Sequence, residues 1–485
     1  MNSWDEQFKR ATADIHSNCH FEESAEMLRK LIRTKLLKFT DLGENPERFF
    51  AAHRLLLSPG TAGQRGPGFG IRFTVQFNLF AGSILGLGGP EQIAQLESMQ
   101  ESGTLGCFCL TEKLAGVNSG LVVNTTATWV PSKQQFLLET PDTDAHKNWI
   151  SQGLTARRAV VIANLIIDGK AYGPHGFVMS LRDENGAPMP GVEMTNMGTK
   201  TTANDLDNAA ISFTGVYLEK SSLLNRFAKI ENDKYVQTTD ERMRLEVIGQ
   251  RLLTGRMAIA QAGVAFARTL YKKTFEYATT KMCWAPKGQP QPSLAELPQL
   301  QHLFAVADEK LNVLEMFNDK VEKSLSVVLR NQSIPDSALV ESIAVSKVKS
   351  IETAIDLCFK LKQEVGSYAL MDKTGFEHGD FLQCCKFAEG DSRILMQKMA
   401  RDSMKAFKGS SWTDSGKDLV FGNTAEHNET KIRFQLSRAL SAAASPSEGA
   451  KLWNSNWTLV YALADAVCDR HFASVLGEDK VLSKL

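Results

Sequence analysis

The sequence predicts an α+β protein in which a helical domain, a β domain and a helical bundle follow one another along the chain. The chain has 485 residues, which is more than one hydrophobic core usually holds. Apolar residues follow helical spacing in the first part, short β-type runs in the middle, and helical spacing again in the rest. We therefore expect domains at residues 1–105, 106–224 and 225–408, with a helical extension at 409–485.

The N-terminal part is expected to contain helices joined by turns. Residues 5–58 have apolar side chains at helical spacing, and a stretch rich in Gly and Pro interrupts them at 58–70. Further helices are expected near 72–85 and 90–99. The glycines between these two helices lack a preceding strand and the spacing of a phosphate loop, so they indicate a helix–helix turn.

The middle part reads as short strands separated by turn residues. Dipeptides such as Asp168-Gly169 and Asn185-Gly186 mark the turns. The expected strands are 121–129, 135–139, 159–167, 176–181 and 209–218. A separate β domain, closed as a barrel or a sandwich, accounts for this pattern.

The C-terminal part is expected to be a helical bundle. Residues 241–280 form one long amphipathic stretch in which small residues such as Gly263 allow close helix packing. More helices are expected near 297–329 and 335–370, from about residue 389, and at 450–476. The segment 409–428, rich in Ser, Thr and Gly, is expected to be a loop.

Composition excludes several classes of protein. Lys plus Arg equals Asp plus Glu, at 55 each, so no overall basic field indicates nucleic acid or anionic lipid as a partner. The longest apolar run, 159–167, is too short to span a bilayer. The eight cysteines lack the spacing of a metal site, so no metal is expected.

Five short strings stand in order between residues 106 and 401. They are Leu110-Thr111-Glu112 with the turn that follows, Thr125-Thr126-Ala127-Thr128, Lys147-Asn148-Trp149-Ile150-Ser151, Tyr172-Gly173-Pro174-His175-Gly176-Phe177, and Phe387-Ala388-Glu389-Gly390-Asp391 with Met399-Ala400-Arg401. In residues, order and spacing they resemble the acyl-CoA dehydrogenase and acyl-CoA oxidase flavoprotein superfamily. The second, fourth and fifth strings are more similar to the oxidases.

This resemblance implies an acyl-CoA oxidase-like fold: an N-terminal helical domain, a middle β-barrel domain and a C-terminal helical bundle. The oxidases also have an extra C-terminal helical domain, and Lys451–Trp457 resembles one of its helices. Because the sequence stops at residue 485, we expect that extension to be shortened.

The implied reaction removes hydrogen across Cα–Cβ of an acyl thioester, which needs a base for the α proton and an acceptor for the β hydride. No side chain accepts hydride, so a bound flavin, FAD, is required. Glu389 matches the catalytic glutamate of the superfamily and would be the base. There its backbone N–H and a flavin hydroxyl also bind the thioester carbonyl and stabilise enolate charge. Alternatively, Glu389 is only an acidic residue at the start of the following helix.

The resemblance also indicates residues that hold FAD. Leu110 and Thr111 match the segment whose amides and hydroxyl meet the flavin ring, Trp149 matches the aromatic side chain beside the ring, and Ser151 matches its hydrogen-bonding neighbour. Three further residues complete the cofactor-binding set. Arg256 matches the arginine at the start of the first long bundle helix, and Gly375 lies in the loop for the pyrophosphate. Lys281 stands near the end of that helix where many members have an arginine, so the charge is kept but the bidentate fork is lost.

One departure affects that loop. The superfamily has Gly-Gly-x-Gly, which lets backbone amides approach the pyrophosphate. This chain has Asp372-Lys373-Thr374-Gly375, so an acidic residue stands where phosphate is expected. We expect FAD to bind differently or more weakly, or Lys373 to contact the phosphate. Ser392 replaces the Asn that follows the Glu-Gly-Asp string.

The chain's last three residues, Ser483-Lys484-Leu485, form the tripeptide that the peroxisomal import receptor reads at a free C terminus. We therefore expect a peroxisomal, homodimeric, FAD-dependent acyl-CoA oxidase that converts acyl-CoA to trans-2-enoyl-CoA and reduces O₂ to H₂O₂. Two alternatives stay open. One is an acyl-CoA dehydrogenase that passes electrons to another flavoprotein, and the other is a cofactor-poor member of the superfamily that acts as a scaffold.

Overall fold

The structure, a computed structural model, describes residues 3–16, 19–57, 67–116, 122–239, 245–409 and 424–476. They divide into two compact units. Unit 1 covers Met1–Ala258 and Ser326–Ile334, and unit 2 covers Ile259–Leu325 and Pro335–Leu485. The boundaries between the units fall inside two long helices, so each unit is described by itself.

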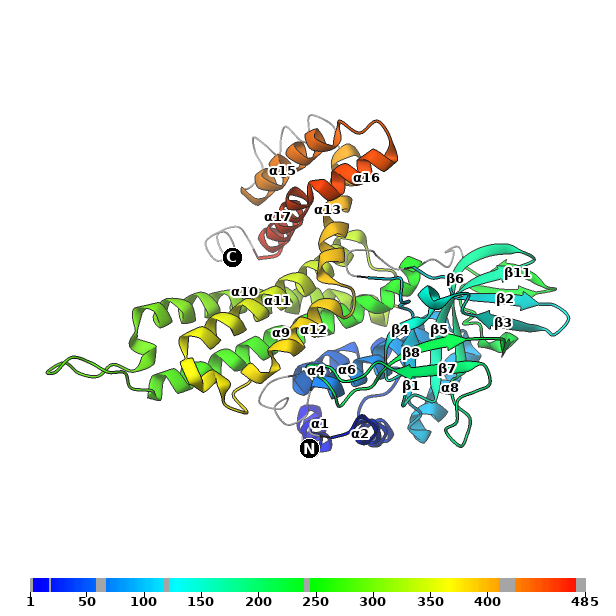
Figure 1. The fold of residues 1–485 in the computed structure, drawn as a ribbon, viewed down its shortest axis with the longest axis horizontal. Coiled ribbons are helices and arrows are strands. Elements are labelled where there is room, and N and C mark those ends of the chain that lie inside the picture. Colours follow the sequence, from blue (N-terminus) through cyan, green and yellow to red (C-terminus); the bar gives the residue numbers. More distant parts are fainter. Residues whose placement is uncertain are drawn as a thin grey trace. The chain divides into compact units, whose positions relative to one another are not determined.

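Unit 1 begins with helices, drawn in blue in Figure 1. They are α1 (Trp4–Ala11), α2 (Phe21–Arg33), α3 (Asp41–Glu44), α4 (Pro46–Leu57), α6 (Pro67–Thr74), the π-helix η1 (Val75–Ala81), α7 (Gly82–Leu87) and α8 (Pro90–Ser102). The prediction of one helix near 72–85 was therefore wrong in detail, because the π-helix η1 separates α6 from α7. A π-helical turn shifts the hydrogen bonds by one residue, and hydrophobic spacing does not reveal it.

The strands of unit 1 form the half-barrel of the middle domain. They are β1 (Gly106–Cys109), β2 (Thr126–Val130), β3 (Gln135–Glu139), β4 (Lys147–Ser151), β5 (Arg158–Ile167), β6 (Lys170–Ser180), β7 (Val192–Asn196), β8 (Asn208–Phe213), β9 (Val216–Glu219), β10 (Ala228–Glu231) and β11 (Lys234–Gln237), with the short 3-10 helices η2 (Thr143–Ala145) and η3 (Lys220–Ser222). The largest sheet has the order β1-β5-β2-β3-β9, with β6 on β5. The others are β4-β8-β7 and β10-β11.

Strand β5 organises the largest sheet. It pairs in parallel with β1 and with β2, and antiparallel with β6. Seven of its ten residues are buried, five of them in succession, whereas β3 alternates buried and half-buried residues. Fully buried side chains from several strands, including Phe136, Phe177 and Ile211, form one core. The alternation in β3 is that of a strand with one face on the core and one toward solvent.

A buried ion pair joins the helices of unit 1 to its strands. The guanidinium of Arg72, on α6, has no exposed surface and lies 2.9 Å from a carboxylate oxygen of Asp207. It also donates to the side chains of Gln152 and Thr155 and to the carbonyl of Asp205. A buried charge is tolerated only when it is paired and hydrogen-bonded, so this contact fixes α6 on the β domain.

Unit 2 is helical. Its helices are α9 (Leu245–Thr280), α10 (Pro298–Arg330), α11 (Ser337–Glu364), α12 (Gly379–Phe387), α13 (Ser392–Gly409), α15 (Thr424–Leu440), α16 (Pro446–Ser455) and α17 (Trp457–Leu476), with the short 3-10 helices η4 (Leu294–Glu296), η5 (Gly366–Leu370) and η6 (Phe376–His378). The unit boundaries fall inside α9 and α10.

The long helices α9, α10 and α11 run side by side in Figure 1. A Cβ atom at Gly263 of α9 would lie 2.5 Å from Ile351 of α11, so the glycine allows these helices to approach closely. Asn318 of α10 donates to Ser350 of α11. The small residues that indicated a packed bundle therefore do line its contacts.

The C-terminal helices pack on the bundle through buried charges. Glu429 of α15 is 1% exposed and accepts hydrogen bonds from Ser403, Arg433 and Arg470. Arg470 of α17 also donates to Glu341 of α11. The part expected as a helical extension thus belongs to the same compact unit as α11 and α13.

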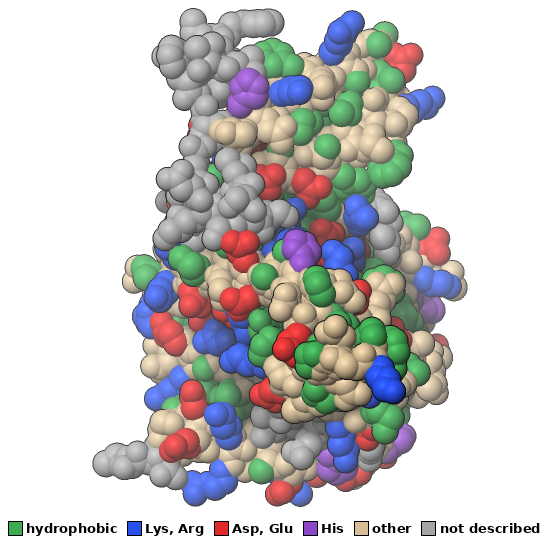
Figure 2. Space-filling model, turned by 90° about the vertical axis from the view of Figure 1, so that its left-hand side faces the viewer, with side chains coloured by type: hydrophobic (Ala, Val, Ile, Leu, Met, Phe, Trp, Pro, Cys, Tyr) green, Lys and Arg blue, Asp and Glu red, His purple; other side chains and the backbone are tan. Residues whose placement is uncertain are grey.

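The predicted fold class is confirmed, since N-terminal helices, a central half-barrel and C-terminal helices occur in that order. The expected strand at 209–218 is two strands, β8 and β9, and the strands continue to Gln237, beyond the expected boundary at 224. Among the described residues, no helix is long and apolar enough to cross a membrane. Acidic and basic side chains are mixed over the face drawn in Figure 2, as equal numbers of the two predict.

Candidate functional site

In unit 1, three of the five strings meet at one buried carboxylate. Glu112 has no exposed surface and accepts hydrogen bonds from the backbone and hydroxyl of Thr125. It also accepts one from Lys147, at 2.8 Å. Burial lowers the pKa of Lys147, while the Glu112 carboxylate opposes that shift. This ion pair holds the segments around Thr111 and Trp149 together, since the N–H of Asn148 also donates to the carbonyl of Thr111 at 2.8 Å.

Trp149 lies at an irregularity of β4. The pairing register of β4 with β8 shifts between Lys147 and Ile150, and Trp149 has a φ of 55°, in the left-handed region. Its side chain is 55% exposed. A bulge with a strained residue re-aims a side chain, and such features cluster at functional sites. An indole placed outside the core in this way offers a flat apolar surface to a ligand.

Polar and apolar residues lie on the segments next to Trp149 in the chain and in the sheet. Leu110 is buried, Thr111 is half-buried, and the Leu110 carbonyl accepts a hydrogen bond from Lys147. The hydroxyl of Ser151 accepts a hydrogen bond from the amide of Asn208. The structure therefore places Leu110 and Thr111 directly after β1 and Trp149 and Ser151 within β4, and the bond from Asn148 to Thr111 joins these two segments. Their composition fits the ring of a flavin.

The other predicted residues lie on helical segments. Arg256 is half-buried in the part of α9 that belongs to unit 1. In unit 2, Lys281 is exposed where α9 has ended, and its backbone carbonyl accepts a bond from Leu294. The rings of Tyr277 and Tyr368 stack with centroids 3.8 Å apart, so the end of α9 lies beside η5. The roles of these residues as contacts to FAD stay predictions.

Glu389 lies in the turn between α12 and α13. Two successive residues of this turn are in the left-handed region, Glu389 with φ 56° and Gly390 with φ 98°. Asp391 then caps α13, since its side chain accepts from the backbone of Arg393 and Ile394. Glu389 therefore precedes the helix and does not lie in it, and its side chain is half-buried. A strained non-glycine residue at this place supports a functional role over that of a simple helix cap.

The loop that would meet the pyrophosphate is closed by its own carboxylate. The N–H of Gly375 donates to Glu377 at 2.7 Å, and the hydroxyl of Thr374 donates to the same oxygen. Asp372 and Lys373 are exposed. A phosphate at this loop would have to displace Glu377, so the loop as it stands does not fit a pyrophosphate.

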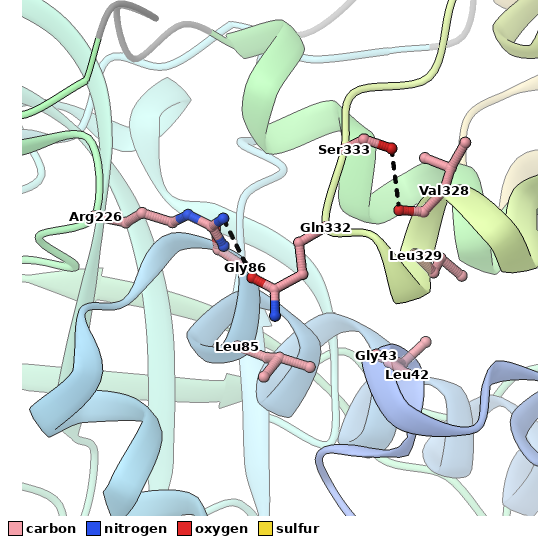
Figure 3. Close-up of a pocket in the computed structure, with 9 residues that line it drawn as sticks. All are labelled: Leu42, Gly43, Leu85, Gly86, Arg226, Val328, Leu329, Gln332 and Ser333. Atoms are coloured by element: carbon pink, nitrogen blue, oxygen red, sulfur yellow. Dashed lines mark hydrogen bonds between the residues drawn. The ribbon is translucent and has the colours of Figure 1, made fainter.

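The pocket shown in Figure 3 lies elsewhere in unit 1. It is lined by Leu42, Gly43, Leu85, Gly86, Arg226, Val328, Leu329, Gln332 and Ser333. Arg226 donates to Gln332 across it at 3.4 Å. No residue of the predicted site lines this pocket, so it gives no support to the proposed chemistry.

Reasoning from the sequence missed the residues that support the site. Glu112 and Lys147 lay inside the matched strings, close in sequence to Thr111 and Trp149, and that position was a usable signal. Lys347 of α11, which donates to the turn of Glu389, lies in none of the matched strings and gave no signal in the sequence. A single lysine on a long helix usually lies on its solvated face.

Comparisons with known proteins agree with the matched strings. No family model matches the chain. It is 26% identical over 418 residues to "Acyl-coenzyme A oxidase 2, peroxisomal" of Arabidopsis thaliana, covering 81% of this chain and 58% of that protein. It is 29% identical over 367 residues to an acyl-coenzyme A oxidase of Kluyveromyces lactis, covering 70% and 49%. The chain spans about half the length of these curated relatives.

Solved structures share the fold. Acyl-CoA oxidase 1 of Yarrowia lipolytica superposes with a TM-score of 0.79 at 19% identity, over 99% of this chain and 77% of that one. Acyl-CoA oxidase-2 of Caenorhabditis elegans, solved with FAD, ascaroside-CoA and ATP, gives 0.76 at 18% identity, over 97% and 75%. At these identities the likeness shows the fold alone.

Proposed function

Because the chain belongs to the acyl-CoA oxidase and dehydrogenase superfamily, we propose that it is an FAD-dependent acyl-CoA oxidase. The reaction is the conversion of acyl-CoA to trans-2-enoyl-CoA, with O₂ reduced to H₂O₂. The observation that carries the proposal is the strained turn that holds Glu389 outside the regular helices on either side of it.

In this proposal Glu389 takes the proton from Cα of the acyl thioester. Its own backbone N–H binds the thioester carbonyl, where negative charge develops as the proton leaves. FAD, when bound, supplies the hydride acceptor that no side chain provides. Trp149 packs beside the flavin ring, while Thr111 and Ser151 offer hydrogen-bonding groups to its edge. Arg256 and Lys281 are the proposed cations for its phosphates.

One observation favours an alternative. The carboxylate of Glu377 accepts the hydrogen bond of the Gly375 amide, and Asp372 adds a second carboxylate to the same loop. A member of the superfamily that binds FAD poorly would have such a loop. A visible spectrum of the purified protein separates the two functions, because bound oxidised flavin is yellow. A colourless protein that gains no flavin on incubation with FAD would favour the scaffold.

The decisive experiment measures peroxide and flavin reduction together. We expect straight-chain acyl-CoA to bleach the flavin without air and to give stoichiometric H₂O₂ in air, in a coupled peroxidase assay. Glu389→Gln keeps the shape of the side chain and removes the base, so turnover should fall by about 10²- to 10⁴-fold with FAD retained.

The matched control is Glu364→Gln, at an exposed glutamate that ends α11, and it should leave turnover unchanged. Turnover by Glu389→Gln near the wild-type rate would remove Glu389 as the base. Bleaching without aerobic peroxide would indicate an acyl-CoA dehydrogenase.

Location and assembly complete the proposal. The curated relatives include oxidases that are named peroxisomal. Ser483-Lys484-Leu485 lies outside the described residues, so the import receptor as a partner rests on the sequence alone. We propose a peroxisomal homodimer with acyl-CoA and O₂ as its substrates.

A further inference from the structure

A buried lysine donates to the turn of Glu389 from the neighbouring helix. Lys347 lies near the middle of α11 and has no exposed surface. Its Nζ donates to the carbonyl of Lys386 at 2.7 Å, the carbonyl of Gly390 at 2.8 Å and the hydroxyl of Ser392 at 3.0 Å. All of these residues belong to unit 2, so the geometry is internal to one compact body.

The three acceptors match the three donors of an ammonium group. Lys386 is in the last turn of α12, Gly390 directly follows Glu389, and Ser392 opens α13. The lysine therefore bonds to the chain on both sides of Glu389. Burying an ammonium group is costly unless its hydrogen bonds are satisfied, and here three are made. Such a group holds its partners in one arrangement, because any movement of the turn breaks at least one of these bonds.

The turn needs such a constraint. A non-glycine residue in the left-handed region costs about 1 kcal/mol or more, and it persists only where the surroundings enforce it. Glu389 and Gly390 are both in that region. The carbonyl of Gly390 points to Lys347, and the α12 end is closed by the bond from Ala388 to Cys384. Lys347 thus links the end of one helix, the turn of Glu389 and Gly390, and the start of the next helix.

We infer that Lys347 is a positioning residue that holds the carboxylate of Glu389 in place for proton abstraction. This inference rests on the proposed function, in which Glu389 is the base. Lys347 itself touches neither substrate nor cofactor in this scheme. It acts through the backbone of the turn.

The test compares two lysines on the same helix. Lys347→Met removes the three hydrogen bonds while keeping the length of the side chain. Lys349→Met is the matched control, because Lys349 is also largely buried but pairs with Asp465 of α17, 2.8 Å away. Ser392→Ala is a milder variant that removes one of the three acceptors, for use if Lys347→Met folds poorly.

The kinetic readouts are kcat, KM for acyl-CoA, bound FAD, and the kinetic isotope effect with substrate deuterated at Cα. Misplacing a catalytic group by about 1 Å can cost about 10²-fold in rate. We expect Lys347→Met to lower kcat by about that factor with KM and FAD content unchanged, and to raise the isotope effect because proton abstraction becomes slower. Lys349→Met should leave kcat and the isotope effect unchanged. Equal losses in both variants, or an unchanged kcat in Lys347→Met, would overturn the inference.

A measurement without turnover separates this inference from the proposed function. Amide hydrogen exchange at residues 388–392 should be faster in Lys347→Met than in wild type, and unchanged in Lys349→Met. Unchanged exchange in Lys347→Met would overturn the inference even if the enzyme is an active oxidase. Faster exchange in a protein that oxidises no acyl-CoA would support the link to the turn and overturn the proposed function, together with the catalytic role that depends on it.

Discussion

At the scale of single residues, Asp205 is a carboxylic acid whose ionised form is destabilised by burial in the folded protein. Its side chain is 2% exposed, one oxygen accepts from the N–H of Gly68 at 3.2 Å, and burial raises its pKa from 3.8 to about 6. Because the folded state holds this proton more tightly than the unfolded state, stability is lost as the pH rises from about 4 to about 6. Above about pH 6 the ionised carboxylate lowers the free energy of unfolding by its full amount.

We therefore predict that Asp205→Asn stabilises the protein at pH 7.5, by up to about 3 kcal/mol for two pKa units. At pH 4 it should change stability little. The comparison is Asp207→Asn, which leaves the buried Arg72 without its carboxylate and should destabilise by about 3–5 kcal/mol. Urea unfolding at the two pH values measures both. A loss of stability at pH 7.5 in Asp205→Asn would show that its charge is needed.

The matched strings predicted which residues form the candidate site but not their backbone conformations. The strings indicated Trp149 and Glu389, but nothing in them predicted that both have left-handed backbone. Those conformations depend on partners distant in sequence. Trp149 sits at a bulge set by pairing with β8, and the Glu389 turn is bonded to Lys347. Side-chain identity alone does not encode such contacts.

At the scale of elements, the loop between η5 and α12 presents carboxylates at the place where the proposed function needs a site for the FAD pyrophosphate. Glu377 accepts from Gly375, and Lys273 of α9 donates to the carbonyl of Lys373 at 3.4 Å. Burial lowers the pKa of His378, so this ring adds little positive charge at neutral pH. A phosphate approaching the loop therefore meets carboxylates as well as lysines.

We predict that Glu377→Ala tightens FAD binding. The substitution frees the N–H of Gly375 and removes a negative charge that repels the phosphates. We expect the free energy of FAD binding to improve by about 0.5–1.4 kcal/mol, which is about two- to tenfold in Kd. Flavin fluorescence during titration of the apoprotein measures the constant. Glu364→Ala, at the exposed end of α11, is the control and should leave Kd unchanged. Weaker binding in Glu377→Ala would mean that the carboxylate orders the loop for its ligand.

Element prediction succeeded where local periodicity decides the structure. The strand at 135–139 and the end of the helix at 280 were predicted as they occur in β3 and α9. It failed at β1, whose four residues are all buried, and at β7, which has a single buried residue, because neither strand shows the alternation that identifies β3. The expected strand at 209–218 contains Gly215, with φ 65°, which turns the chain between β8 and β9.

At the scale of the whole molecule, the order of helical, β and helical parts followed from the sequence, but the compact units did not. The helices expected as a separate extension pack on α11 and α13 through Glu429 and Arg470. The charged residues that make this contact are far apart in the sequence, and nothing in the sequence distinguishes them from charged residues exposed to solvent. Burial of Glu429 is visible only once the helices are packed.

The last prediction concerns where the whole protein resides. A Ser-Lys-Leu tripeptide is read by the import receptor only at a free carboxyl terminus, so the effect proposed for it here does not depend on the fold of either unit. We expect a chain with a fluorescent protein fused to its N terminus to enter peroxisomes. Removing Ser483–Leu485 should leave it in the cytosol without changing the proposed acyl-CoA oxidase activity. Adding two residues after Leu485 should have the same effect, because the tripeptide is then internal. Import that persists in both variants would mean that another segment or a partner carries the protein into the organelle, and the tripeptide would lose its proposed role.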